Sequence, residues 1–112
     1  MPVKVYPMGY NTRMNTIART TEFDEWLASL GDLKARAKII VRIRNAELGN
    51  LGSYRVLEGG VSEMKIDFGP GYRVYFAREG RVTYLLLCGG DKSTQNEDIR
   101  LAVRMWKQIQ KQ

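Results

Sequence analysis

The sequence contains no histidine and only one cysteine among its 112 residues. The absence of histidine excludes Ser-His-Asp and Cys-His mechanisms, and also RNA cleavage by a pair of histidines. The single cysteine, Cys88, can form no intrachain disulfide and belongs to no zinc-binding cluster. Because Cys88 lies within an apolar run, we expect it to be a small core residue rather than a nucleophile.

Long apolar runs and low-complexity segments are also missing. No run approaches the length that spans a membrane, and the N-terminal stretch MPVKVYPMGYNTRM lacks the apolar segment of a signal peptide. We therefore expect a cytoplasmic protein that makes no contact with a membrane. The length predicts a single domain. Residues 1–13 contain two prolines and a glycine, so we expect a flexible extension there, and Met14 is an alternative start.

Basic residues outnumber acidic residues by 18 to 12, which gives a formal net charge of +6 and a pI of about 9.7. A small basic domain can bind nucleic acid or an acidic partner protein. It can also simply have a basic surface, and charge alone favours this simpler interpretation.

The first half of the chain is predicted to form a strand and two helices. A strand is expected over residues 15–20, followed by a helix that Thr21 caps and Gly31 ends. Asp32 is expected to cap a second helix over residues 33–48, which Gly49 ends. This tight connection predicts a helical hairpin. The predicted core stripe of the second helix consists of Leu33, Ala37, Ile40 and Val41, widened by Ile43.

The second half changes to the alternating pattern of strands, over residues 61–68, 72–78 and 82–88. With residues 69–71 as the first loop, Met64, Ile66, Val74 and Phe76 share an apolar face. The second hairpin turns at Glu79-Gly80 and is expected to add Leu85 and Leu87 to that face.

The opposite sheet face is predicted to be polar. Lys65 is expected opposite Tyr75 and diagonal to Arg73, and Asp67 opposite Arg73. Tyr84, Leu86 and Cys88 are placed nearby.

The stretch GGDKST joins the last strand to a C-terminal helix. Gly89-Gly90 is expected to turn the chain sharply and to deliver Asp91 and Lys92 to the rim of the polar face. The alternative is a turn with an incidental ion pair. Thr94 and Glu97 are expected to form a capping box. The helix is predicted to bury Ile99, Ala102, Val103 and Trp106.

Three segments together identify a resemblance: TTEFDEWLASLGDLKARAKIIVRI, GVSEMKIDFGPGYRVYF and LLLCGGDKSTQNEDIRLA. They look like the addiction-module killer proteins, a phage-derived, HigB-like group of the RelE/ParE toxin superfamily. The resemblance covers about residues 15–106. It implies an α+β fold with an N-terminal strand, a helical hairpin, an antiparallel sheet and a C-terminal helix, in agreement with the element order predicted above.

The resemblance also implies the toxin of a type II toxin–antitoxin pair. The RelE and HigB branches cut mRNA on the ribosome without a metal or cofactor, whereas the ParE branch inhibits gyrase. Arg73 matches the superfamily's strand arginine, and Asp91-Lys92 matches the loop that supplies active-site residues. Lys65 stands where this group usually has arginine, so it keeps the charge but loses bidentate phosphate binding.

Metal-free RNA cleavage requires deprotonation of the 2′-OH, stabilisation of charge on phosphorus and protonation of the 5′-oxygen. Arg73 is expected to stabilise the charge, with an ion pair to Asp67 as the alternative. Lys65 is expected to bind the phosphate or act as the base, unless it is an ordinary solvated lysine. Lys92 is a candidate proton donor, and Asp91 a candidate base or orienting group.

Three further residues are candidates for RNA binding. Tyr75 offers a stacking surface for a base, with strand packing as the alternative. Arg55 and Arg78 can hold flanking phosphates or be plain surface charges.

Three functions therefore remain open at this point: a ribosome-dependent endoribonuclease toxin, a gyrase-inhibiting toxin, and an inactive module that only binds its antitoxin. The expected partners of the nuclease are mRNA, the ribosome and a helix-turn-helix antitoxin. The antitoxin would cover the basic face or the apolar residues Tyr84 and Leu86, which we expect to be exposed.

Overall fold

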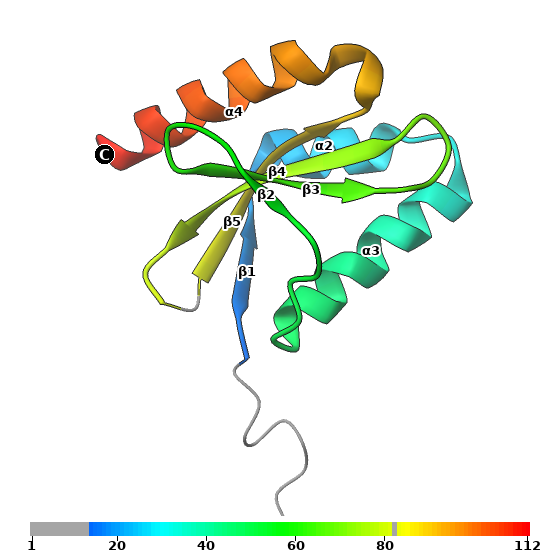
Figure 1. Cartoon of the computed structure of the whole chain (residues 1–112), viewed down its shortest axis with the longest axis horizontal. Helices are drawn as coiled ribbons and strands as arrows, with labels where there is room; N and C mark the ends of the chain where they lie inside the picture. Colours follow the sequence, from blue (N-terminus) through cyan, green and yellow to red (C-terminus); the bar gives the residue numbers. More distant parts are fainter. Residues whose placement is uncertain (1–13, 82) are drawn as a thin grey trace, which may run out of the picture.

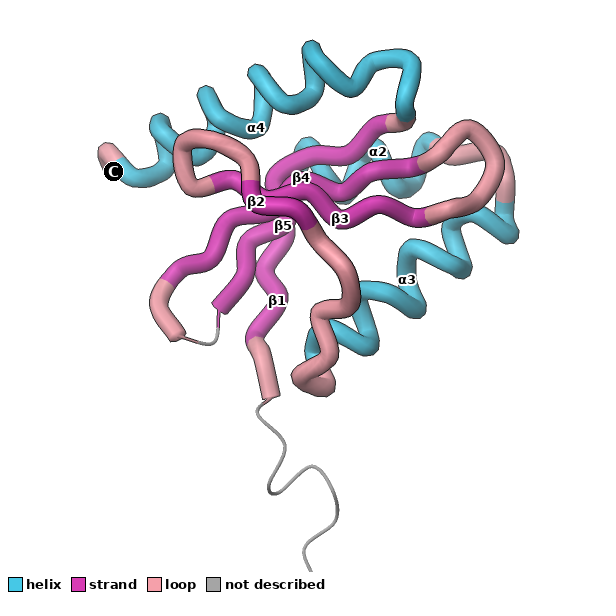
Figure 2. The backbone as a smooth tube through the Cα atoms, viewed as in Figure 1, coloured by secondary structure: helices cyan, strands magenta, loops and turns pink. Residues whose placement is uncertain are grey.

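The computed structural model describes residues 14–81 and 83–112. It confirms an α+β fold whose element order agrees with the resemblance. Figures 1 and 2 show a central sheet with helices on both sides. The expectations for residues 1–13 and for Val82 lie outside the described residues. The strands are β1 (Thr16–Arg19), β2 (Arg55–Val56), β3 (Val61–Ile66), β4 (Tyr72–Glu79) and β5 (Thr83–Gly90). The helices are α2 (Thr21–Ser29), α3 (Leu33–Glu47), the short 3₁₀ turn η1 (Lys92–Thr94) and α4 (Gln95–Gln110).

The sheet is mixed rather than wholly antiparallel, with the strand order β1-β5-β4-β3-β2. β1 pairs with β5 in parallel, whereas the other pairs are antiparallel. A parallel pair needs a long connection, which α2, α3 and the following strands supply. The edge strand β2 was not predicted, because two residues are too few to show a period.

The β3–β4 hairpin keeps the predicted faces but not the predicted partners. Its loop spans residues 67–71, where the Phe68 N–H donates to the Ile66 carbonyl and the Gly71 N–H to the Phe68 carbonyl. Gly69 and Gly71 both have positive φ, at 57° and 80°. As a result Lys65 lies opposite Arg73, and the expected pairing of Asp67 with Arg73 is wrong. Because the shift is two residues, every side chain stays on its predicted face.

The faces of β5 differ from the prediction because Glu79 pairs with Thr83, so Glu79 belongs to β4 and not to the turn that was expected at Glu79-Gly80. A β-bulge follows further along the strand: Tyr75 pairs with Cys88 but Phe76 pairs with Leu86, so Leu87 is the extra residue. Leu86 therefore lies on the same side as Phe76 and is only 3% exposed. The expectations that Tyr84 and Leu86 are exposed, and that Leu85 and Leu87 share the face of Phe76, are wrong, because Tyr84 packs against the first core and Leu85 against the second.

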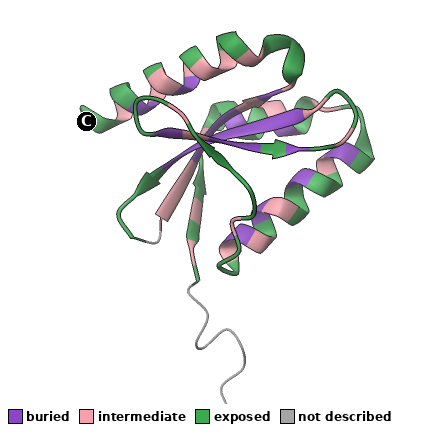
Figure 3. Cartoon of the chain, in the orientation of Figure 1, coloured by how far each residue is buried: buried purple, intermediate pink, exposed green. Residues whose placement is uncertain are grey.

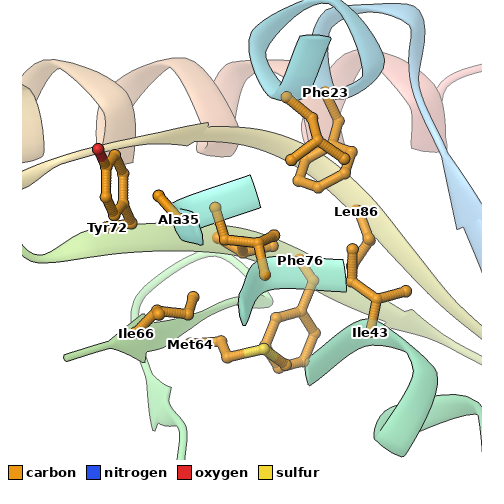
Figure 4. Close-up of a cluster of buried hydrophobic side chains, with 11 residues drawn as sticks. Phe23, Ala35, Ile43, Met64, Ile66, Tyr72, Phe76 and Leu86 are labelled. Carbon is orange, nitrogen blue, oxygen red and sulfur yellow. The ribbon is translucent and has the colours of Figure 1, made fainter. Parts of the chain in front are cut away.

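Two hydrophobic cores lie on opposite faces of the sheet. The first is covered by α2 and α3, and Figure 4 shows its side chains converging from these helices and three strands. The second lies under α4, which buries Ala102 and Trp106 as predicted, with Ile99 and Val103 packed against them. Cys88 belongs to this second core, and burial raises the pKa of its thiol to about 12. Its predicted role as a core residue is confirmed.

Helix α3 faces the core with a different stripe from the one predicted. Its buried residues are Ala35, Ile39, Ile43 and Ala46. Of the predicted stripe, Leu33 is 71% exposed, Val41 55% and Ile40 41%. The helix carries two apolar stripes, and the contacts with β1 and the sheet select the one formed by Ala35, Ile39 and Ala46, with Ile43 belonging to both the predicted and the observed core. The exposed parts of α3 are green in Figure 3.

The helix caps agree only partly with expectation. Asp32 accepts hydrogen bonds from the N–H groups of Lys34 and Ala35, and Gly49 ends α3 with a φ of 98°, both as predicted. The cap of α2 is Thr20 rather than Thr21. The capping box is absent from the described start of α4: the Thr94 hydroxyl instead donates to the Asp98 carboxylate, at 2.6 Å.

Gly89 and Gly90 lie within β5 and do not form the expected turn. A Cβ atom at Gly89 would collide with the ring of Trp26, and one at Gly90 with the carboxylate of Asp98. The need for glycine therefore comes from close packing on both sides of the strand.

Among the described residues, no helix is long and apolar enough to cross a bilayer.

Candidate functional site

Two adjoining hollows lie beside strand β3. The larger, of about 560 Å³, extends over β2 and reaches Gln95 at the start of α4. The smaller, of about 300 Å³, lies over the β3–β4 loop and reaches Lys92. Both are lined by Lys65, Asp67 and Arg73, so we treat them as one cleft and call it the cationic cleft.

The cationic cleft brings together most of the cations predicted from the sequence. Arg73, Lys65 and Lys92 line the smaller hollow together, although they come from β4, β3 and η1. Arg55 lines the larger hollow from β2.

Glu63 organises the floor of the cleft. Its carboxylate accepts hydrogen bonds from Arg55 Nη2 at 3.0 Å and from Gln95 Nε2 at 2.9 Å. Arg73 Nε lies 3.7 Å from the same carboxylate. Glu63 is 5% exposed and thus links β2, β4 and α4 from a buried position. No sequence motif marks Glu63, although its position two residues before Lys65 places it on the polar face.

Arg73 lies deep in the cleft, with 6% of its surface exposed. Its ion-pair partner is Glu63 and not Asp67, and its Nη1 donates to the Gly71 carbonyl at 2.7 Å. Its Nε is buried without a hydrogen-bond partner among the described residues. A guanidinium has five N–H donors, of which Gly71 takes one, and the low exposure leaves only a small part of the group open to the cleft.

Lys65 and Asp67 occupy the rim that the two hollows share. The distance from Lys65 Nζ to Asp67 Oδ1 is 3.3 Å, and both side chains are exposed. An exposed pair of this kind is held weakly, so a phosphate can displace the carboxylate from the ammonium group. Asp67 was predicted only as the partner of Arg73. In the structure it is instead the carboxylate at the rim of the cleft.

Asp91 holds the turn that carries Lys92. Its carboxylate accepts hydrogen bonds from both the hydroxyl and the backbone N–H of Ser93. These hydrogen bonds lower the pKa of Asp91 below its ordinary range. A carboxylate with a lowered pKa is a weak base, so the geometry favours the predicted orienting role over the predicted role as base.

Tyr75 is fully buried, so the predicted stacking surface for a base is wrong. The ring lies in the core under α4, which takes the space that an RNA base would need. Burial first, and then the negative charge of Glu63, raises the pKa of its hydroxyl. The alternative interpretation of Tyr75, strand packing, is correct.

Arg78 lies away from the cleft. It is at the other end of β4 from Arg73, and five residues of strand span about 17 Å. Its guanidinium donates to the carbonyls of Gly80 and Arg81 and so closes the β4–β5 turn. The structure therefore does not group Arg78 with the other predicted RNA-binding residues.

No known family model matches the chain. Over 86 residues, however, the chain is 48% identical to a protein of Haemophilus influenzae (strain ATCC 51907 / DSM 11121 / KW20 / Rd) described as an uncharacterized protein. The matched region covers 77% of this chain and 87% of that protein. The two proteins belong to one family. The description of the Haemophilus influenzae relative states no activity, so the function has to be inferred from the cleft.

The chemistry available in this member of the family is that of cations and carboxylates. The described residues contain no group of three or more His, Cys, Asp or Glu side chains arranged to hold a metal ion. A concave surface with three cations from separate elements suits a phosphodiester, whose two non-bridging oxygens accept charged hydrogen bonds. The buried guanidinium is pre-organised for that task, because Glu63 and Gly71 fix its orientation.

Proposed function

We propose that this protein is the toxin of a type II toxin–antitoxin pair and that it cleaves mRNA on the ribosome. The observation that carries the proposal is the meeting of Lys65, Arg73 and Lys92 around one hollow. The sequence resemblance supports it independently, since Arg73 and the Asp91-Lys92 loop match positions that the superfamily uses, whereas Lys65 replaces its usual arginine.

In the proposed reaction the 2′-oxygen attacks phosphorus and the bond to the 5′-oxygen breaks. The products are a 2′,3′-cyclic phosphate and a free 5′-hydroxyl. Arg73 and Lys65 bind the non-bridging oxygens and stabilise the charge that develops on them. Lys92, which is exposed at the rim, gives a proton to the leaving 5′-oxygen.

Asp67 is the best-placed base for the 2′-OH, because it lines both hollows and is exposed. Glu63 and Asp91 act as positioning residues in this scheme. Glu63 orients Arg73 and Arg55, and Asp91 shapes the turn that presents Lys92.

The RNA is aligned by the ribosome in this proposal. The fully buried Tyr75 offers no stacking surface, and the aromatic side chains that line the cleft are Tyr54 and Phe68. Backbone charge with so few aromatic surfaces holds single-stranded RNA weakly and without a fixed register. The ribosome, which positions the RNA, supplies the affinity and register that the cleft lacks.

One observation favours an alternative, the inactive module that binds only an antitoxin. Arg73 is largely enclosed and already paired with a carboxylate, so the cleft can hold an anion without cutting it. Gyrase inhibition remains the other alternative, and the next experiment separates all three.

The test is to induce the protein in bacteria and to map the 5′ ends of mRNA. We expect growth arrest with discrete cuts in translated mRNA. We expect Lys65→Ala and Lys92→Ala each to lower cleavage about 100-fold, the loss typical of a missing charged or acid–base group. Lys107→Ala is the matched control, because it removes an exposed lysine from α4.

Intact mRNA together with double-strand breaks in DNA would support gyrase inhibition instead. Normal growth with intact mRNA would support the inactive module. Cleavage that is unchanged in both cleft variants would show that the cationic cleft is not the active site.

A further inference from the structure

Helix α3 presents a second apolar stripe to the solvent. With 3.6 residues per turn, Leu33, Ala37, Ile40 and Val41 lie on the side of the helix opposite the buried Ala35, Ile39 and Ala46. Leu33 is 71% exposed and Val41 55%. Solvent-facing apolar side chains that line up along a helix are typical of an interaction site rather than of a monomer surface.

An apolar hollow borders this stripe. It has a volume of about 410 Å³, and Ile66 of β3 contributes to its wall. Ala37 and Val41 line it from the helix, and Lys38 and Arg42 contribute cations. The combination of an apolar stripe and an adjoining hollow can take an apolar side chain from a partner.

Positive charge surrounds this surface. Within α3 the cations Lys34, Arg36, Lys38, Arg42 and Arg44 stand against one acid, Glu47. Asp67 at the edge of the hollow is already paired with Lys65. A partner that covers the stripe without unfavourable charge contacts must therefore be acidic.

We propose that this α3 surface, defined by the exposed stripe and its hollow, binds an acidic amphipathic helix of a partner protein. The apolar residues of that helix pack on Ala37, Ile40 and Val41, and one of them enters the hollow. Its flanking carboxylates meet Lys34, Lys38 and Arg44. The inference does not depend on the reaction proposed for the cationic cleft.

Other occupants fit the surface less well. A second copy of this chain would bring two cationic helices face to face, against a net charge of +6 on each copy. The N-terminal residues 1–13 carry Lys4 and Arg13 but no acid, so they lack the complementary charge. An anionic membrane has that charge, but a shallow hollow of about 410 Å³ between α3 and β3 suits a single inserted side chain better than a flat bilayer surface.

Arg42 connects this surface to the cationic cleft. Its guanidinium donates to the carbonyl of Lys65 at 2.9 Å and to that of Ser53 at 2.9 Å. Asp67 likewise borders both the apolar hollow and the cleft. A helix bound on α3 would thus contact residues that hold the rim of the cleft without filling it.

The test uses synthetic amphipathic peptides of about 18 residues, which is five helical turns. One peptide carries leucines on one face and glutamates on its flanks, and its counterpart has lysine in place of each glutamate. They are added to the isotope-labelled full chain, and amide shifts are followed by NMR. We expect the acidic peptide to shift α3 amides between Ala37 and Arg44, together with Ile66 and Asp67, and the basic peptide to bind at least tenfold more weakly.

Two variants keep the test specific. Val41→Asp places a carboxylate on the stripe and is expected to lower the affinity for the acidic peptide at least tenfold. Val56→Asp is the matched control, because Val56 is 72% exposed on β2, outside the α3 surface, and its replacement is expected to leave binding unchanged. Both positions are exposed, and a thermal melt of each variant verifies folding.

Three outcomes would overturn the proposal. The first is an absence of α3 shifts, or equal shifts with the basic peptide. The second is self-association that Val41→Asp abolishes, which would assign the surface to a dimer. The third is Val41-dependent cosedimentation with vesicles of phosphatidylglycerol and phosphatidylcholine without peptide binding, which would assign the surface to a membrane.

Discussion

The most consequential single residue in the cleft is Glu63, a buried carboxylate that no sequence motif marked. It contacts three side chains from three elements. Its neighbour two positions along, Lys65, pairs with the exposed Asp67. The chain thus holds a buried ion pair and an exposed one around the same strand, and this allows a matched comparison.

Glu63→Gln is expected to destabilise the fold by about 3 kcal/mol, because the buried Arg73 loses its counter-charge. Asp67→Asn removes an acid of the same charge from an exposed pair and is expected to cost less than about 1 kcal/mol. Urea unfolding at neutral pH measures both free energies. Equal losses would show that the burial of Glu63 is not what makes it important.

Several residues could be placed from sequence because their pattern is local. Asp32 and Gly49 mark the ends of α3 by cap chemistry alone, and alternation placed Lys65 and Arg73 on one face. Tyr75 could not be assigned in this way. Its alternation shows which face it occupies, but only the packing of α4 decides whether that face is open to solvent.

At the scale of elements, the short turn η1 depends on a single carboxylate. Asp91 caps it through Ser93 and thereby sets the position of Lys92. The hydrogen bonds from Ser93 hold the folded-state pKa of Asp91 below the unfolded value of about 3.9. The ionised carboxylate therefore stabilises the fold above that value, and this contribution is lost as the pH falls through the lower, folded-state pKa.

We expect Asp91→Asn to flatten the loss of stability between about pH 5 and pH 3, the range around the unfolded pKa. Stability at neutral pH is expected to fall by less than about 1 kcal/mol, because the site is exposed. Unfolding curves at a series of pH values test this. In the proposed nuclease, Asp91→Asn keeps most of its activity if Asp91 positions Lys92, and loses it if Asp91 is the base.

The element-scale errors of sequence interpretation have two physical causes. Helix α3 has two apolar stripes, and periodicity gives no reason to choose the one formed by Ala35, Ile39 and Ala46, which contacts with distant elements select. The faces of β5 depend on where the preceding turn begins, and because Glu79 pairs with Thr83 instead of starting the turn, the two faces are exchanged.

At the scale of the whole molecule, strands β4 and β5 belong to both cores. Phe76 and Leu86 pack under α2 and α3, whereas Tyr75 and Leu87 pack under α4. Neither core can open without disturbing strands that the other core needs. This arrangement predicts one cooperative transition rather than two.

The two tryptophans report on the two cores separately, because Trp26 packs against the first and Trp106 lies in the second. Trp106→Phe leaves only the first reporter and Trp26→Phe only the second. Within each variant, the urea midpoint from fluorescence is expected to equal the midpoint from circular dichroism. Different midpoints in either variant would reveal that one core unfolds by itself.

Gly89 and Gly90 leave the end of β5 without side chains, just before the turn that carries Lys92. The indole of Trp26 in α2 packs against Gly89, and the carboxylate of Asp98 in α4 packs against Gly90. A larger residue at Gly89 would push α2 away from the sheet, and one at Gly90 would push α4 away. Because Gly90 pairs with Arg73 and lies two residues before Lys92, a larger residue there is expected to move Lys92 relative to Arg73.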